Sequence, residues 1–66
     1  MSYKEYLYTQ LIADEVIDEE DFDIDEIDEE TLLTETDLEQ EDLDNYEQQF
    51  KEHCQLNGEE PEWDLD

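Results

Sequence analysis

Apolar residues near the start of the chain recur at intervals of three and four, which is the spacing of one face of an α-helix. They are Tyr3, Tyr6, Leu7, Leu11 and, on the flank, Ile12. Ser2 precedes them and Glu5 follows Ser2 by three residues, as in a capping box in which the serine side chain accepts a backbone hydrogen bond. The pattern predicts a helix over about residues 2–14.

A longer stripe of the same spacing lies in the second half of the chain. Its members are Leu43, Tyr46, Phe50 and Cys54. Thr36 and Glu39 have the spacing of a second capping box at its start, and Gly58 offers a left-handed stop at its end. These signals predict a helix over about residues 37–56.

The segment between these helices is dominated by acidic residues, which make up 12 of the 17 positions in residues 14–30. Residues 21–25 alternate acidic and apolar side chains, as a half-buried strand would. Aspartate disfavours the interior of both strands and helices, because its short side chain competes for backbone hydrogen bonds. We therefore expect an acidic loop or a short helix here.

These elements predict a small, mainly α fold with one domain over residues 1–58 and an extended acidic tail over residues 59–66. Leu, Ile, Val and Phe supply 15 of 66 residues, about 23%, which is above the roughly 20% below which highly charged chains are disordered. A core of this size is thin. The stripe from Leu43 to Cys54 offers a face for a homodimer that would support it.

Charge narrows the range of partners. The chain carries 26 acidic residues against two lysines, for a formal net charge of −24. Two lysines cannot neutralise phosphates, so direct binding to nucleic acid or to anionic membranes is not expected. No apolar run approaches the roughly 18 residues of a membrane span, and the N-terminus does not resemble a signal peptide. These observations predict a cytoplasmic protein.

Catalysis and metal binding are not expected either. His53 and Cys54 are sequence neighbours, so on a helix they point about 100° apart and make a poor nucleophile–base pair. The aspartates of residues 21–25 match the first three ligand positions of an EF-hand loop. Glu26 then stands where glycine is needed, and Leu32 where a bidentate glutamate is needed. We predict no enzyme activity, no metal site and no cofactor.

The density of negative charge is the feature that remains to be explained. Duplex DNA carries one charge per ~1.7 Å, so 24 charges correspond to roughly 40 Å of duplex. A domain of this length has a diameter of roughly 28 Å, so its charge per unit length matches or exceeds that of DNA. A basic DNA-binding groove would meet a similar field.

With acidic runs such as 18–21 and 28–30, the chain resembles the small acidic DNA-mimic inhibitors of bacteriophages and mobile elements. These include anti-restriction and anti-CRISPR proteins and inhibitors of nucleases and of uracil-DNA glycosylase. The resemblance lies in size, charge and acidic runs and involves no shared motif. It implies a protein that occupies the DNA-binding site of a basic host protein in the host cytoplasm.

The residues expected to form the mimic surface are the acids of the middle segment and those at the start of the last helix. They are Asp14, Glu15, Asp18, Glu19, Glu20, Asp21, Asp23, Asp25, Glu26, Asp28, Glu29, Glu30, Glu39, Glu41, Asp42 and Asp44. Trp63 in the tail is a candidate anchor for a partner's pocket, or a residue that packs back on the last helix. The alternative function is an acidic, partly disordered interaction module that docks on a basic regulator or transcription protein.

Overall fold

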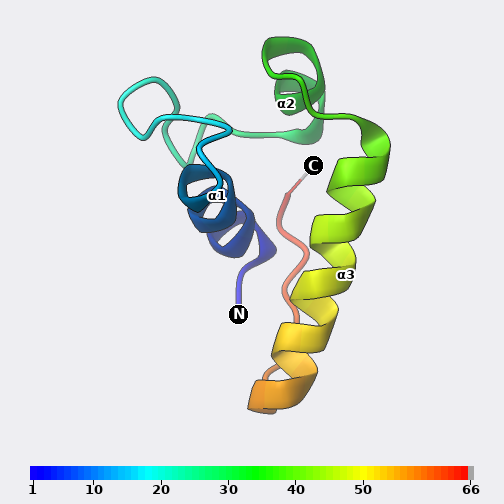
Figure 1. Ribbon diagram of the computed structural model, residues 1–66. Helices are drawn as coiled ribbons and strands as arrows, with labels where there is room; N and C mark the ends of the chain where they lie inside the picture. Colours follow the sequence, from blue (N-terminus) through cyan, green and yellow to red (C-terminus); the bar gives the residue numbers. More distant parts are fainter. Residues whose placement is uncertain (66) are drawn as a thin grey trace.

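The computed structural model describes residues 1–65 and contains three helices (Figure 1): α1 (Tyr3–Ala13), α2 (Glu29–Glu35) and α3 (Gln40–Asn57). Residues 1–65 contain no strand, only an isolated bridge between Ser2 and Glu62. The helices α1 and α3 pack against each other, while the loop that follows α1 leads across to α2. The predicted mainly α fold, with two main helices and an acidic loop and short helix between them, is confirmed.

Helix α1 begins as predicted, because the Ser2 hydroxyl accepts a hydrogen bond from Glu5 N–H at 3.3 Å. It ends in a reverse turn in which Glu15 N–H donates to Ile12 O (3.1 Å) and Val16 N–H donates to Leu11 O (2.9 Å). Such a turn usually places glycine in its left-handed position. Here Glu15 occupies that position with a φ of 60°. The chain is thereby redirected from α1 into the acidic loop.

The boundary between α2 and α3 differs from the prediction. Thr36 does not start the last helix; it ends α2, because its N–H and its hydroxyl both donate to Leu32 O. Helix α3 instead begins at Gln40, where the Asp42 carboxylate accepts the Glu39 N–H at 3.0 Å. Thr36 and Glu39 do have capping-box spacing, but the threonine hydroxyl is engaged by the preceding helix.

The end of α3 follows the sequence closely. Gly58 takes a left-handed φ of 67°, with its N–H bonded to Gln55 O at 3.3 Å. Glu59 N–H donates to Cys54 O at 2.9 Å, which completes a Schellman motif. A residue with a Cβ is disfavoured at such a φ, so glycine marks the stop.

The core draws on all three helices and on the acidic loop. Its buried members are Tyr3, Leu7, Leu11, Ile17, Ile27, Leu32, Leu43, Phe50 and Cys54. Ile17 and Ile27 lie near the two ends of the loop, so burying them fixes the path of the highly charged segment between them. Cys54 is 1% exposed and belongs to the apolar stripe, as its spacing predicted.

The two ends of the chain are held together. Tyr3 N–H donates to Glu62 O (2.9 Å) and Glu62 N–H donates to Met1 O (2.8 Å). The Ser2 hydroxyl donates to the Asp64 carboxylate at 2.6 Å, and this bond is the main cause that holds the pKa of Asp64 below its usual value. The segment 59–65 is extended and, in the view of Figure 1, runs between α1 and α3.

Candidate partner-binding surface

The acids expected to form the mimic surface lie on the outside of the molecule. Of the 16 residues, 13 are exposed and three are half-buried, namely Asp28, Glu29 and Asp42. With only two lysines in the chain, at least 24 of the 26 carboxylates have no lysine of their own. With so few cations to offset them, these acids make the surface strongly negative.

Apolar anchors turn the loop acids outward. Tyr8 Oη donates a hydrogen bond to Phe22 O at 2.6 Å, which fastens the middle of the loop to α1. Phe22 itself is half-buried against the core, while its neighbours Asp21 and Asp23 are exposed. The alternating residues 21–25, whose pattern is also typical of a strand, therefore belong to a loop that begins with a turn, in which Phe22 N–H donates to Asp18 O at 3.0 Å.

Asp28 and Asp42, two of the predicted surface acids, hold the starts of helices. The Asp28 carboxylate caps α2 by accepting the Thr31 N–H at 2.6 Å, and this backbone hydrogen bond is the main cause that lowers the pKa of Asp28. Asp42 accepts the Glu39 N–H at the start of α3. Both acids add to the negative field, but their first role is to hold a helix end.

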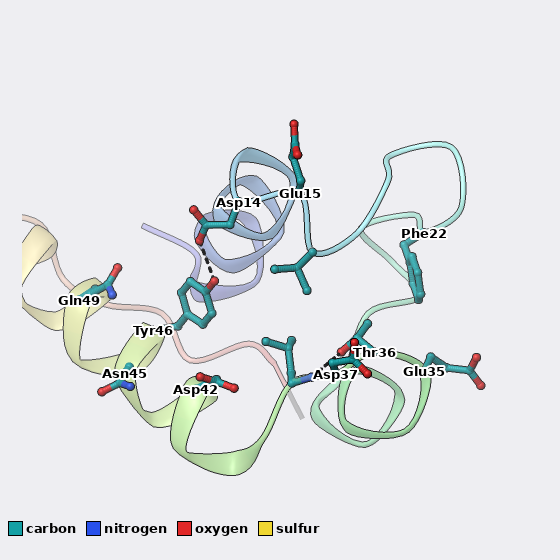
Figure 2. Close-up of a pocket in the computed structure, with 12 residues that line it drawn as sticks. Asp14, Glu15, Phe22, Glu35, Thr36, Asp37, Asp42, Asn45, Tyr46 and Gln49 are labelled. Atoms are coloured by element: carbon teal, nitrogen blue, oxygen red, sulfur yellow. Dashed lines mark hydrogen bonds between the residues drawn. The ribbon is translucent and has the colours of Figure 1, made fainter.

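The fold also creates a hollow that the sequence did not reveal, here called the acidic groove (Figure 2). It has a volume of about 690 Å³ and lies between the start of the acidic loop, the link from α2 to α3, and the first half of α3. Its lining residues are Asp14, Glu15, Val16, Phe22, Glu35, Thr36, Asp37, Leu38, Asp42, Asn45, Tyr46 and Gln49. Five of these are acids and none is basic.

Tyr46 bridges two sides of the groove. Its hydroxyl donates to the Asp14 carboxylate at 2.7 Å, which connects the end of α1 to α3 (Figure 2). Burial, followed by this bond to an anion, raises the pKa of Tyr46 to about 12. The bond holds Asp14 beside the ring, while the Glu15 side chain points away from the hollow.

Sequence reasoning found only part of this groove. Asp14, Glu15 and Asp42 were among the expected surface acids, whereas Glu35 and Asp37 were not. Both missed acids lie next to Thr36, and they reach the groove because α2 ends there. Their placement depends on the boundary between α2 and α3, which the spacing of Thr36 and Glu39 placed three residues too early.

A second group of acids, none of them fully buried, lies near Tyr3. Burial raises the pKa of the Glu47 carboxyl above its usual range, and the nearby charges of Glu29 and Asp44 raise it further. The same side chains contribute, after burial, to a raised pKa of the Tyr3 hydroxyl. Negative charge is therefore also crowded around Glu47, away from the acidic loop.

Trp63 packs back on the protein rather than standing free. Its ring centroid lies 5.0 Å from that of Tyr3 and 5.1 Å from that of Phe50, and Lys51 Nζ lies 5.8 Å from it. The side chain is still 46% exposed. This arrangement agrees with the alternative in which Trp63 packs back on the last helix, and it leaves one part of the ring accessible.

Other kinds of site were also sought in residues 1–65. This part of the chain holds no group of three or more His, Cys, Asp or Glu side chains arranged to hold a metal ion. It also has no helix that is both long and apolar enough to cross a membrane. The chain matches no protein-family model, and no curated protein or solved structure matches it significantly.

Proposed function

We propose that this protein is a DNA-mimic inhibitor that occupies the DNA-binding site of a basic DNA-processing or defence protein of a bacterial host. The supporting observation is charge density. A net charge of −24 over a long axis of 33 Å gives one charge per about 1.4 Å, compared with ~1.7 Å for duplex DNA.

The fold supports this proposal by presenting the charge on a preformed surface. Ile17, Phe22 and Ile27 anchor the acidic loop, so its carboxylates need little further ordering when a partner binds. Association between such a surface and a basic groove is fast, steered and sensitive to salt. In this proposal the partner is a host nuclease, restriction or CRISPR effector, or glycosylase, met in the host cytoplasm.

The first test is a tagged pull-down from nuclease-treated bacterial lysate at low and at moderate salt. The proposal predicts recovery of one DNA-processing enzyme that resists moderate salt and is released by added duplex DNA. A diffuse set of basic proteins that washes away with salt would contradict it. Capture of a basic regulator that still binds DNA would favour the alternative, an acidic interaction module.

Matched charge variants then locate the surface. One variant neutralises Asp18, Glu19, Asp21 and Asp23 to Asn or Gln, and its control neutralises the exposed acids Glu52, Glu59, Glu60 and Glu62 to Gln. Both remove four charges, from −24 to −20, so they change the net charge equally. Loss of binding in the first variant alone supports the loop as the mimic surface; equal loss in both contradicts that placement.

A further inference from the structure

We propose that the acidic groove is the docking site for an arginine side chain, together with an apolar neighbour, from a basic segment of the partner protein. This inference rests on the proposed function and identifies the partner's chemistry at one place on the charged surface. Copying phosphate charge alone does not call for apolar side chains in a charged hollow, so the apolar part of this lining points to a further occupant.

The floor of the groove is apolar and only partly covered. Val16 and Phe22 from the loop, Leu38 from the α2–α3 link and Tyr46 from α3 line it, and all four side chains are half-buried. Their exposed parts converge in one hollow, although they come from three separate segments. A hollow of about 690 Å³ lies within the ~300–1,000 Å³ range of ligand pockets, so it accommodates more than a single water or ion.

All the charged residues that line the groove are negative. Asp14, Asp37 and Asp42 contribute carboxylates from three segments, and no lysine or histidine lines the hollow. Figure 2 shows Asp14 and Asp42 on opposite sides of the Tyr46 ring. A cation above that ring would be flanked by carboxylates on both sides. Charge complementarity therefore selects a positively charged occupant.

Arginine suits this arrangement better than lysine. A planar guanidinium stacks on aromatic faces such as those of Tyr46 and Phe22, and its fork of donors matches carboxylates. Its methylene stem, or an apolar residue beside it, would cover Val16 and Leu38. A compact hydrated ammonium would satisfy the carboxylates but would leave the apolar floor exposed to water.

The structure provides a closely matched pair of variants to test this docking site. Gln48 and Gln49 are adjacent, exposed residues of α3, but only Gln49 lines the groove. Gln49→Arg places a competing guanidinium at the groove, whereas Gln48→Arg makes the same change of charge outside it. Both variants keep the core intact, so a difference between them reports on the groove itself.

The probes are short synthetic peptides of equal charge in which arginine is combined with leucine, arginine with serine, or lysine with leucine. Binding to the intact protein is measured by titration calorimetry, and amide chemical shifts locate the contact. At about 150 mM salt, where exposed charges are screened beyond ~8 Å, the arginine–leucine peptide should bind about tenfold more tightly than the other two. Gln49→Arg should weaken it about tenfold, and Gln48→Arg less than about twofold.

Equal affinity for the three peptides, or equal loss in the two variants, would overturn the docking site. Neither result would affect the inhibitor proposal, which is judged separately by competition with duplex DNA. Conversely, a groove that passes this test in a protein that does not compete with DNA would support the docking site and overturn the inhibitor proposal.

Discussion

Tyr3 provides an unusual opportunity to stabilise the protein by removing a polar atom. The side chain is 2% exposed, and its hydroxyl is buried without a hydrogen-bond partner among residues 1–65. Its ring packs on Phe50 and Trp63, with centroids 5.2 and 5.0 Å away. Tyr3→Phe keeps these ring contacts and removes only the hydroxyl.

The expected gain follows from the cost of burying an unpaired polar group, which is about 1–3 kcal/mol. Because the cavity left by one oxygen offsets part of this, we expect Tyr3→Phe to raise the free energy of unfolding by about 1 kcal/mol. For a domain of this length, that corresponds to an increase in Tm of roughly 4–8 °C. Urea and thermal unfolding followed by far-ultraviolet circular dichroism would measure both quantities.

Tyr46→Phe is the matched control, because its hydroxyl donates to Asp14 at 2.7 Å. Loss of that partly exposed bond should lower the free energy of unfolding by about 0.5–1 kcal/mol. The two substitutions remove the same atom and should act in opposite directions. A Tyr3→Phe protein that is less stable than the wild type by a similar amount would refute the reasoning, since it would show that the Tyr3 hydroxyl is satisfied.

Four further predictions concern the end of α1 and the dependence of stability on pH. Glu15→Gly should stabilise the protein by about 1 kcal/mol, because glycine tolerates the left-handed φ of 60° at the end of α1, and Glu15→Ala, which keeps that strain, should gain less in the same thermal melts. Stability should rise as pH falls from 7 into the mildly acid range, because folding raises the pKa of Glu47. A carboxyl of this kind stabilises the protein below its unfolded pKa and loses that effect as pH rises through its folded pKa. A Tm that falls steadily over this range would contradict the prediction. Below that range the trend should reverse, since the lowered pKa values of Asp28 and Asp64 give stability that is lost as pH falls through them. In alkali, the pKa of Tyr46, raised to about 12, implies that stability is lost between pH ~10, the usual tyrosine value, and that value; Tyr46→Phe should remove this component, as measured by urea unfolding across the alkaline range.

Local signals in the sequence identified the two main helices, α1 and α3, because the residues that start and end them act locally. Ser2 caps α1 and Gly58 ends α3 through contacts within a few residues, so spacing alone identified both. Thr36 failed as a start signal because its hydroxyl has two competing uses. The choice between them depends on whether the preceding seven-residue helix forms, and that depends on burying Leu32 in a core assembled from distant segments.

In the candidate site, too, local signals predict some features, while others depend on packing between distant segments. That the loop acids face outward follows from composition, since carboxylates without partners stay in water. The acidic groove could not be predicted, because Asp14 and Tyr46 are 32 positions apart and meet only when α1 packs on α3. The apolar floor was equally hidden. The alternating pattern of residues 21–25 assigns Phe22 no neighbour, and the predicted helix over 37–56 includes Leu38, whereas α3 begins at Gln40.

DNA mimicry requires that this protein and duplex DNA compete for one site on the same partner. The decisive measurement is equilibrium competition, in which fluorescently labelled duplex DNA bound to the captured partner is titrated with this protein and followed by anisotropy. We predict complete displacement and an apparent Kd for DNA that increases linearly, without a limit, with the concentration of the protein, and no ternary complex. Displacement that reaches a plateau, or a complex containing the partner, DNA and this protein together, would contradict DNA mimicry.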